Sequence, residues 1–482
     1  MRNIVWLMII VAALLTSCSD WLEEKPKAVA AETFYNTEEE ANAAVLAPIE
    51  KFRSAFAMSY PGLMETFADY AYGRGSWESN SDYEGLDTQN QTRANMVWAA
   101  CYKVIRDCNI AISRLPEASE LSETSKAAYI GELRFLRALG YFYLVRCYSD
   151  CILRTEENMD EFNLNKSSAE TVYTYIIDDL SYAIENAPDK ARLVGTPCKN
   201  SARSLLAQVY LQLGNYQNAA SYSKEVIDSK SYSLVPVSSS RDFDKIFGAD
   251  VVNTTEEIFY LKQDNETNIG WEYVMFCAHP SAKINGEPMH GAGGWYGIYT
   301  TTENKLISEW DVNDFRKDFN LLQLDFGLGD NTYLLAKFHD PSSRASGNSN
   351  PLIRYPDILF TYAEAITKAT GSPTADAIEA LNKIHRRAYG YDPESPSEID
   401  FKLSDYGSVD KFMEILIREQ AYECFNEAKR WPFLVRLGIA KEQIRKIKGI
   451  DVADRHLLFP IPTTEFNYNE ALDPSKDQNP GY

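Results

Sequence analysis

The chain has 482 residues, more than one compact core usually supports, so we expect several substructures or a solenoid. Its 45% hydrophobic and 24% charged residues are ordinary for a folded protein. The net charge of −21, without any cluster of lysine and arginine, argues against nucleic acid as a partner and against anionic polymers as the main ligand. A local basic pocket remains compatible with that average.

The first 17 residues have the pattern of a signal peptide. A short basic start precedes an apolar run at residues 4–15, which is too short to span a bilayer comfortably. Leu15-Thr16-Ser17-Cys18 then matches the lipobox of bacterial lipoproteins. We therefore predict that residues 1–17 are removed, that Cys18 is lipidated and anchors the chain to a membrane, and that residues 18–35 form a tether. An ordinary signal peptide with an incidental cysteine is the alternative.

The other cysteines do not have the spacing of a disulfide framework or of a zinc site. Their number is odd, no CxxC pair occurs, and several lie at helical spacing on apolar stripes. We expect buried free thiols at Cys101, Cys108, Cys147, Cys151, Cys198, Cys277 and Cys424.

The first part of the chain combines helical patterns with one irregular stretch. Thr37 is the expected N-cap of a helix over residues 37–53, with acidic residues in its first turn. Residues 60–95 lack a sustained period and are rich in Gly, Ser, Asn, Asp, Tyr and Trp, which is typical of a functional loop. Apolar periodicity then predicts helices at 96–114, 123–149 and 168–187.

Residues 200–229 predict a helical hairpin. The tetratricopeptide pattern is matched at Leu206, Ala207, Tyr210, Gly214, Tyr216 and Ala219. Gly214-Asn215 supplies the turn, because both residues tolerate the left-handed conformation that ends a helix. One such hairpin cannot bury both of its faces, so further hairpins are expected to stack on it.

Helical patterns return after a second aperiodic region at residues 232–299, which contains one strand-like stretch, 257–261. The later helices are predicted at 304–310, 358–369, 374–388 and, as a long helix with its continuation, 409–438. The predicted fold class is mainly all-α: about four tetratricopeptide-like helical hairpins form a scaffold with long irregular loops and a few short strands.

Several stretches together resemble the SusD/RagB family of outer-membrane nutrient-binding lipoproteins. They are ELRFLRALGYFYLVRCYSD, NPLIRYPDILFTYAEAITKATG with ALNKIHRRAYG, ILIREQAYECFNEAKRWPFLVRLG, and the closing LLFPIPTTEFNYNEALDPSKDQNPGY. The signature helix matches at Glu419, Glu423, Glu427, Arg430, Trp431, Leu434, Arg436 and Gly438. Gln420, Ala428, Phe433 and His385 depart from the usual residues, all in packing segments.

The resemblance implies one SusD-like helical domain over residues 36–482, with an N-terminal part to about 300 and a C-terminal part over about 301–482. It implies a lipid-anchored protein on the outer face of the outer membrane that captures oligo- or polysaccharide. The expected partner is a TonB-dependent, SusC-like barrel transporter, to which the glycan is delivered. Some family members bind peptides instead, so a peptide ligand is an alternative.

No pattern of catalytic or metal-binding residues is evident, so we expect neither an enzyme nor a cofactor. The five histidines lack ligand spacing and no serine lies in a nucleophile elbow. Glu419, Glu423 and Arg430 share a predicted helix face, where a structural ion-pair network is the better interpretation. Asp311, Asn313 and Asp314 predict a turn rather than a calcium loop.

Sugar binding requires flat apolar surface edged by hydrogen-bonding side chains. The two aperiodic regions supply such residues, although packing is an equal alternative for any single ring. The predicted ligand-binding residues are Tyr72, Arg74, Trp77, Asn80, Tyr83, Trp271, Trp295 and Tyr296. Asp82, Tyr273 and Tyr299 are further candidates, whereas Trp98, Trp310 and Trp431 are predicted to be core.

Two other functional classes remain open. A protein-interaction adaptor would use the concave face of the hairpins, which leaves the aromatic loops unexplained. A surface glycoside hydrolase would need two carboxylates roughly 5 to 9.5 Å apart, which sequence does not reveal.

Overall fold

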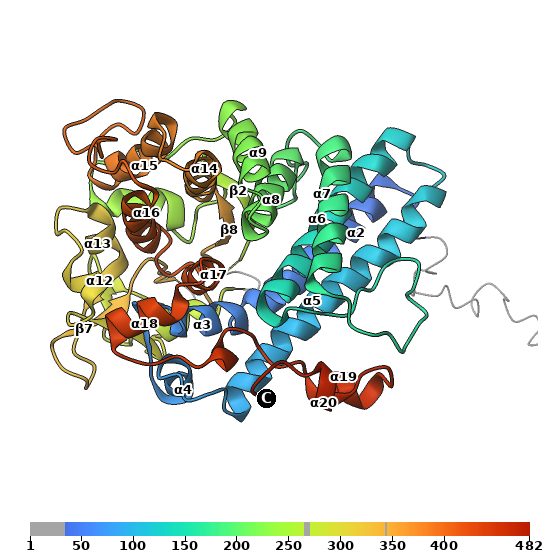
Figure 1. Ribbon diagram of the computed structural model, residues 1–482, viewed down its shortest axis with the longest axis horizontal. Coiled ribbons are helices and arrows are strands. Elements are labelled where there is room, and N and C mark those ends of the chain that lie inside the picture. Colours follow the sequence, from blue (N-terminus) through green and yellow to red (C-terminus); the bar gives the residue numbers. More distant parts are fainter. Residues whose placement is uncertain (1–33, 265–269, 343–344) are drawn as a thin grey trace, which may run out of the picture.

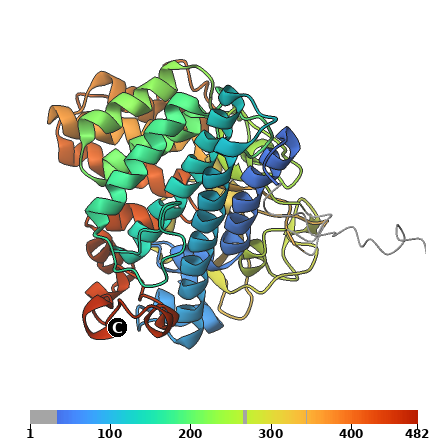
Figure 2. The ribbon, with the colours of Figure 1, turned by 90° about the vertical axis from the view of Figure 1, so that its right-hand side faces the viewer.

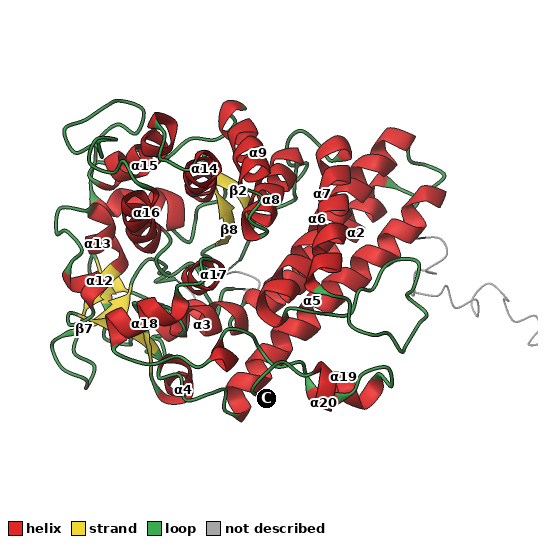
Figure 3. Cartoon of the chain, in the orientation of Figure 1, coloured by secondary structure: helices red, strands yellow, loops and turns green. Residues whose placement is uncertain are grey.

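A computed structural model describes residues 34–264, 270–342 and 345–482. The predicted signal peptide, the lipidation site Cys18 and nearly all of the tether lie outside the described residues. Within them the protein is mainly helical with a few short strands, which confirms the predicted fold class (Figures 1 and 3). No helix in the described part of the chain is long and apolar enough to cross a membrane.

A single stack of antiparallel helices forms the scaffold (Figures 1 and 2). Each helix packs on the next: α2 (Glu38–Phe56), α5 (Thr88–Arg114), α6 (Glu123–Tyr148), α7 (Ala169–Asn186), α8 (Lys199–Gln212), α9 (Tyr216–Asp228), α14 (Tyr355–Thr370) and α15 (Ala375–Ala388). The contact between α9 and α14 continues the stack across residues 229–354. The predicted hairpins are therefore confirmed as one array with a long insertion between its third and fourth hairpins.

The capping and turn residues explain why the ends of these helices could be predicted from the local sequence. Thr37 and Glu40 form a reciprocal capping box at the start of α2, and Ser122 and Ser168 cap α6 and α7. Gly214 turns the α8–α9 hairpin at φ 71°. Each of these residues acts on backbone groups within a few positions of itself, so the helix boundaries are encoded in the local sequence.

The interval 60–95 is more helical than predicted. It contains α3 (Ser59–Thr66) and α4 (Glu78–Ser81), and α5 begins at Thr88 rather than Met96. Asp87 caps α5, and the side chains of Asn90 and Arg93 both donate to the Ser76 carbonyl. The first turns of α5 are thus stabilised by polar tertiary contacts, which an apolar periodicity does not reveal.

The predicted helix over 409–438 is two helices. α16 (Val409–Glu423) ends in a turn where Asn426 and Ala428 are left-handed, and α17 (Arg430–Arg436) starts a new direction. α18 (Ala440–Lys448) follows. Shorter helices complete the described chain: α10 (Asp244–Phe247), α11 (Tyr273–Cys277), α12 (Lys305–Ser308), α13 (Phe315–Asn320), α19 (Thr463–Tyr468) and α20 (Pro474–Asp477).

Three small sheets lie within the long insertion and its contacts. The largest has the order β1–β5–β7–β6, formed by Tyr72–Gly73, Ile298–Thr301, Thr332–Leu335 and Leu321–Gln323. The predicted strand at 257–261 is β2 (Glu257–Leu261), paired with β8 (Asn350–Arg354), and β3 (Lys283–Ile284) pairs with β4 (Glu287–Pro288). The division expected near residue 300 falls inside β5, which pairs with strands on both sides of it.

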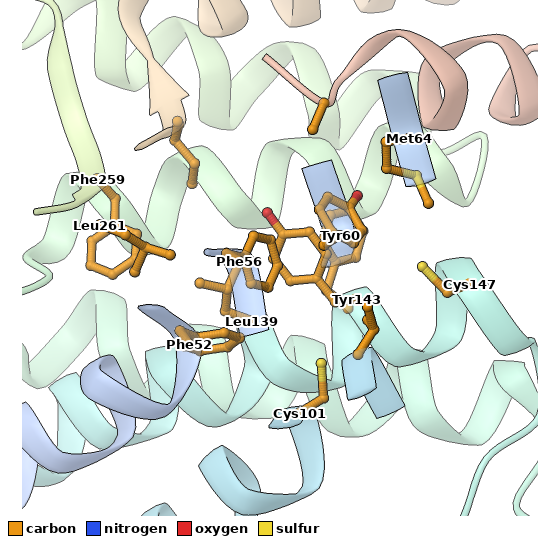
Figure 4. Close-up of a cluster of buried hydrophobic side chains, with 14 of the residues drawn as sticks. Phe52, Phe56, Tyr60, Met64, Cys101, Leu139, Tyr143, Cys147, Phe259 and Leu261 are labelled. Carbon is orange, nitrogen blue, oxygen red and sulfur yellow. The ribbon is translucent and has the colours of Figure 1, made fainter. Parts of the chain in front are cut away.

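The core runs along the inner face of the hairpin array. α6 is buried along most of its length, and Figure 4 shows Tyr143 among Phe52, Phe56 and Tyr60, with ring centroids 4.7 Å apart for Phe56 and Tyr143. The seven cysteines among the described residues are buried free thiols, and Trp98, Trp310 and Trp431 are at most 4% exposed. Both predictions are confirmed.

Candidate functional site

Pairing of β1 with β5 brings the two aperiodic regions together. Tyr72 lies opposite Tyr299, and the backbone N–H of Arg74 donates to the Gly297 carbonyl at 2.7 Å. Gly73 permits the turn that follows it to fold back against β1, because a Cβ there would lie 2.2 Å from the Trp77 carbonyl oxygen. Residues more than two hundred positions apart thus present neighbouring side chains on one surface.

We define the aromatic surface as six rings from these two regions and from the loop between β6 and β7: Tyr72, His279, Trp295, Tyr296, Tyr299 and Phe326. Five of them form a continuous chain of ring contacts. Centroid distances are 5.8 Å from Tyr72 to Tyr299, 5.6 Å from Tyr299 to Phe326, 5.9 Å from Phe326 to Tyr296 and 4.6 Å from Tyr296 to His279.

Trp295 is the most exposed ring of the aromatic surface. Its side chain is 47% exposed, and it rests edge-on against half-buried Phe276 with centroids 4.7 Å apart. The other five rings are half-buried. An indole that is fixed from below and open above offers a rigid apolar face to solvent.

Two basic side chains lie over the faces of these rings. The exposed Arg74 guanidinium is 4.4 Å from the Tyr296 centroid, and the Lys448 ammonium is 5.0 Å from that of Tyr72. Burial, followed by the Asp82 carboxylate, raises the pKa of Tyr299. Burial and then Arg74 lower the pKa of His279, whose Nδ1 lies 2.8 Å from the Ser281 hydroxyl. The surface therefore combines apolar faces with donors and acceptors.

Four of the predicted ligand-binding residues are buried and do not face solvent: Trp77, Asn80, Tyr83 and Trp271 are at most 5% exposed. Trp77 lies beneath Arg93, whose guanidinium carbon is 3.5 Å from the ring centroid, and Trp271 donates from Nε1 to the Phe56 carbonyl. Asn80 and Tyr83 hydrogen-bond to Thr66 and to the Phe67 carbonyl. Their prediction as ligand contacts is corrected: they pack beneath or beside the loops that they shape.

Tyr72, Arg74, Trp295, Tyr296 and Tyr299 lie in the two regions that the β1–β5 pairing joins, and their role in ligand binding stays a prediction. His279 and Phe326 were not predicted. Phe326 follows Asp325 in the turn DFGLGDN, where the Asp325 carboxylate accepts from the N–H groups of Gly327 and Gly329. The sequence signal that could have identified Phe326 is an aromatic residue inside a glycine-rich turn between two short strands.

A large group of titratable side chains lies in the interior around α16. Arg354 contacts Glu256, Glu423 and Glu427 at 3.1, 3.0 and 2.6 Å. Arg316, Lys337 and Arg387 pair with the same carboxylates or with Asp314 and Glu419. We call these nine residues the buried charge network. All are at most 3% exposed, so the network has no surface on which to meet a substrate.

Within the network, nearly every negative charge is balanced by a neighbouring positive charge. Burial alone would raise the pKa of Glu419, but Arg316 and His385 outweigh it and hold that pKa at about 2. The predicted structural role of Glu419 and Glu423 is confirmed. Arg430, however, lies on α17 and pairs with Asp69 at 2.7 Å, because the turn at residues 424–429 separates it from the α16 face.

No group of three or more metal-ligating side chains occurs among the described residues. Asp311 accepts from the Asn313 backbone N–H, and Asp314 caps α13 and pairs with Arg316. The predicted turn at 311–314 is thus confirmed.

Two protein-family models match the chain. A family described as "Starch-binding associating with outer membrane" matches residues 20–211, and the "SusD family" matches residues 285–482. The chain belongs to the SusD/RagB family. A SusD-like protein P2 from Formosa agariphila is 26% identical over 98% of both chains.

Solved structures have the same fold. A SusD homolog from Bacteroides thetaiotaomicron superposes with a TM-score of 0.77 at 21% identity, covering 94% of this chain and 98% of its own. A laminarin-binding SusD-like protein superposes with a TM-score of 0.73 at 22% identity, covering 93% and 100%. The family contains glycan-binding proteins and is associated with the outer membrane.

Proposed function

We propose that this protein binds a glycan on the aromatic surface. The supporting observations are the chain of contacts among five rings, with Arg74 against Tyr296, and the 47% exposed Trp295 next to Tyr296 in the sequence. Pyranose rings have C–H faces that stack on aromatic rings, and their hydroxyls need donors and acceptors at the edge. An exposed indole on an open surface, with the exposed Arg74 over a neighbouring ring, suits an extended sugar chain better than a small enclosed ligand.

Membership of the SusD/RagB family supports the rest of the proposal. The protein acts at the outer membrane, anchored through a lipidated Cys18, and passes its glycan to a SusC-like, TonB-dependent barrel transporter. It acts without catalysis: the carboxylates of the buried charge network are all held by buried cations, and the aromatic surface serves capture alone.

Calorimetry of the purified protein against a panel of polysaccharides tests glycan binding. At least one neutral glycan should bind the wild type, and Trp295→Ala should weaken it. Tyr468→Ala is the matched control, because Tyr468 is an 82% exposed aromatic residue on α19, at the other side of the molecule from β7 in Figure 1. Binding of peptides without binding of any glycan would replace the proposal with peptide capture, and release of shorter sugars on prolonged incubation would indicate a hydrolase.

Delivery is tested separately by mild detergent extraction from the native membrane. A barrel protein of the transporter class should co-purify with the wild type. Its absence from such extracts, with the lipoprotein itself recovered intact, would contradict the partnership and leave glycan binding unaffected.

A further inference from the structure

A cavity lies among the helices of the hairpin array, separate from the aromatic surface. It has a volume of about 130 Å³ and lies where the inner face of α6 and α8 meets β8, α14 and α17. Four residues of its wall, Phe56, Tyr60, Leu139 and Tyr143, are labelled in Figure 4. It shares no lining residue with the aromatic surface, so it requires a separate explanation.

Three carboxylates line this cavity, and each already has a cation. Lys429 lies 2.6 Å from Asp357 and 3.0 Å from Glu427. Arg436 holds Glu364 with two hydrogen bonds of 2.6 and 2.7 Å. These pairs resemble the buried charge network in being internally compensated. They leave no carboxylate for a further cation in the cavity wall.

Arg146 is that further cation. No carboxylate of the described chain lies within ion-pair distance of its guanidinium, and its one hydrogen bond is to the Tyr60 hydroxyl, at a long 3.4 Å. Its Nε is shielded from solvent and has no partner in the described structure. The guanidinium carbon is 4.2 Å from the Phe142 centroid and 4.9 Å from that of Tyr143. The two rings hold the group in place without satisfying its donors.

Two side-chain amides stand beside this cation. Gln208 and Gln212 project from successive turns of α8 and line the same cavity, and Gln212 and Arg146 also line the smaller cavity that adjoins it. Neither amide has a side-chain hydrogen bond to another described residue. Amides in this state are suited to bind hydroxyl groups.

We propose that this cavity binds a sugar acid, with the ligand carboxylate on Arg146 and its hydroxyls on Gln208 and Gln212. A guanidinium with free N–H donors pairs well with a carboxylate, and partial burial strengthens the pair. The aromatic wall formed by Tyr60, Phe142 and Tyr143 gives the sugar ring an apolar face. The cavity wall holds as many carboxylates as cations, and Arg146 is the cation that no carboxylate offsets, so selectivity for an anion rests on Arg146 and not on the overall net charge of −21.

Calorimetric titration of the full-length protein with glucuronate, glucuronate methyl ester and glucose tests the charge requirement without any variant. Glucuronate should bind at least tenfold more tightly than either neutral sugar. Equal binding of the methyl ester, or no binding of glucuronate at millimolar concentration, would overturn the proposal.

Substitution then tests the residue. Arg146→Gln should weaken glucuronate binding at least tenfold and Arg146→Lys should recover part of it, because lysine keeps the charge but not the planar fork. Arg106→Gln is the charge-matched control, since that side chain is 66% exposed on α5 outside the cavity, and it should bind as the wild type does. Unchanged binding by Arg146→Gln would refute the assignment. If that variant fails to fold, Gln212→Ala, on a half-buried residue, provides the test, and wild-type affinity in it would equally refute the proposal.

Discussion

The buried charge network consists of titratable side chains, and the aromatic surface consists mainly of aromatic rings. The two regions differ in how many of their side-chain interactions are already made within the fold. In the network every carboxylate meets a cation, and all nine residues are at most 3% exposed. On the aromatic surface the rings contact one another, but Trp295 and Arg74 remain open to solvent. Side chains whose interactions are complete inside the fold stabilise it, and those left incomplete at the surface are available to a ligand.

The same criterion separates Arg146 from the network. Arg354 and Arg146 are both arginines on the inner side of the hairpin array, yet Arg354 meets three carboxylates and Arg146 none among the described residues. The number of cations in a region therefore says less about function than the number left without a counter-ion.

The largest expected effect comes from breaking the network. Arg354→Met should lower the free energy of unfolding by about 3–5 kcal/mol, because it leaves Glu256, Glu423 and Glu427 buried and under-compensated. Urea denaturation measures the change. Arg445→Met is the control: its pair with Asp451 is 73% and 80% exposed, so its effect should stay within about 0.5 kcal/mol. Equal effects of the two changes would contradict the proposed distinction between buried and exposed pairs.

Acid should destabilise the protein through the same region. The folded-state pKa of Glu427 is about 2, because Arg354, Lys337 and Lys429 outweigh the effect of burial, and Glu419 has a similar value. Both lie below the ordinary value of 4.5, so their stabilisation is present above pH 4.5 and is lost as pH falls toward 2. The urea midpoint should therefore drop between pH 4.5 and 3. Glu419→Gln should reduce this slope, and an unchanged slope would argue against its contribution.

Two tryptophans of the predicted binding loops should respond in opposite ways. Trp77→Ala removes a side chain that is 1% exposed and should cost about 3–5 kcal/mol of stability. Trp295→Ala should leave the thermal midpoint nearly unchanged and weaken glycan binding about tenfold, or about 1.4 kcal/mol. Differential scanning calorimetry and titration on both variants measure the contrast. Loss of binding in a stably folded Trp77→Ala variant, with Trp295→Ala unaffected, would reverse our assignment of the site.

The smallest expected effect concerns the edge of the aromatic surface. Arg74→Ala should weaken glycan binding about two- to fivefold, because Tyr296 loses a cation–π contact of about 0.5–1 kcal/mol that helps to fix its ring and the surface loses an exposed donor. Arg74→Lys should retain part of the affinity in the same titration. A loss as large as that of Trp295→Ala would show that Arg74 holds the glycan directly through strong hydrogen bonds.

The hairpins and their boundaries were predictable because the signals are local. Periodic apolar residues, N-caps such as Thr37 and Ser168, and the turn glycine Gly214 act within a few residues of the structure that they specify. Where helix formation depends on distant partners the prediction failed, as at the start of α5, which is held by Ser76, and at the break between α16 and α17.

The sequence by itself determined the helical hairpin scaffold, the family resemblance and the two loop regions that supply the aromatic residues. The tertiary structure decided which of those residues reach the surface. Trp77 and Trp295 occur in similar glycine-rich surroundings, yet one is covered by Arg93 and Phe276 and the other rests on Phe276 with an open face. That difference depends on the pairing of β1 with β5 and on the packing of α5 against the loop. Aperiodic loops contain no local signal for such contacts, because their side-chain directions are set by partners far away in the chain.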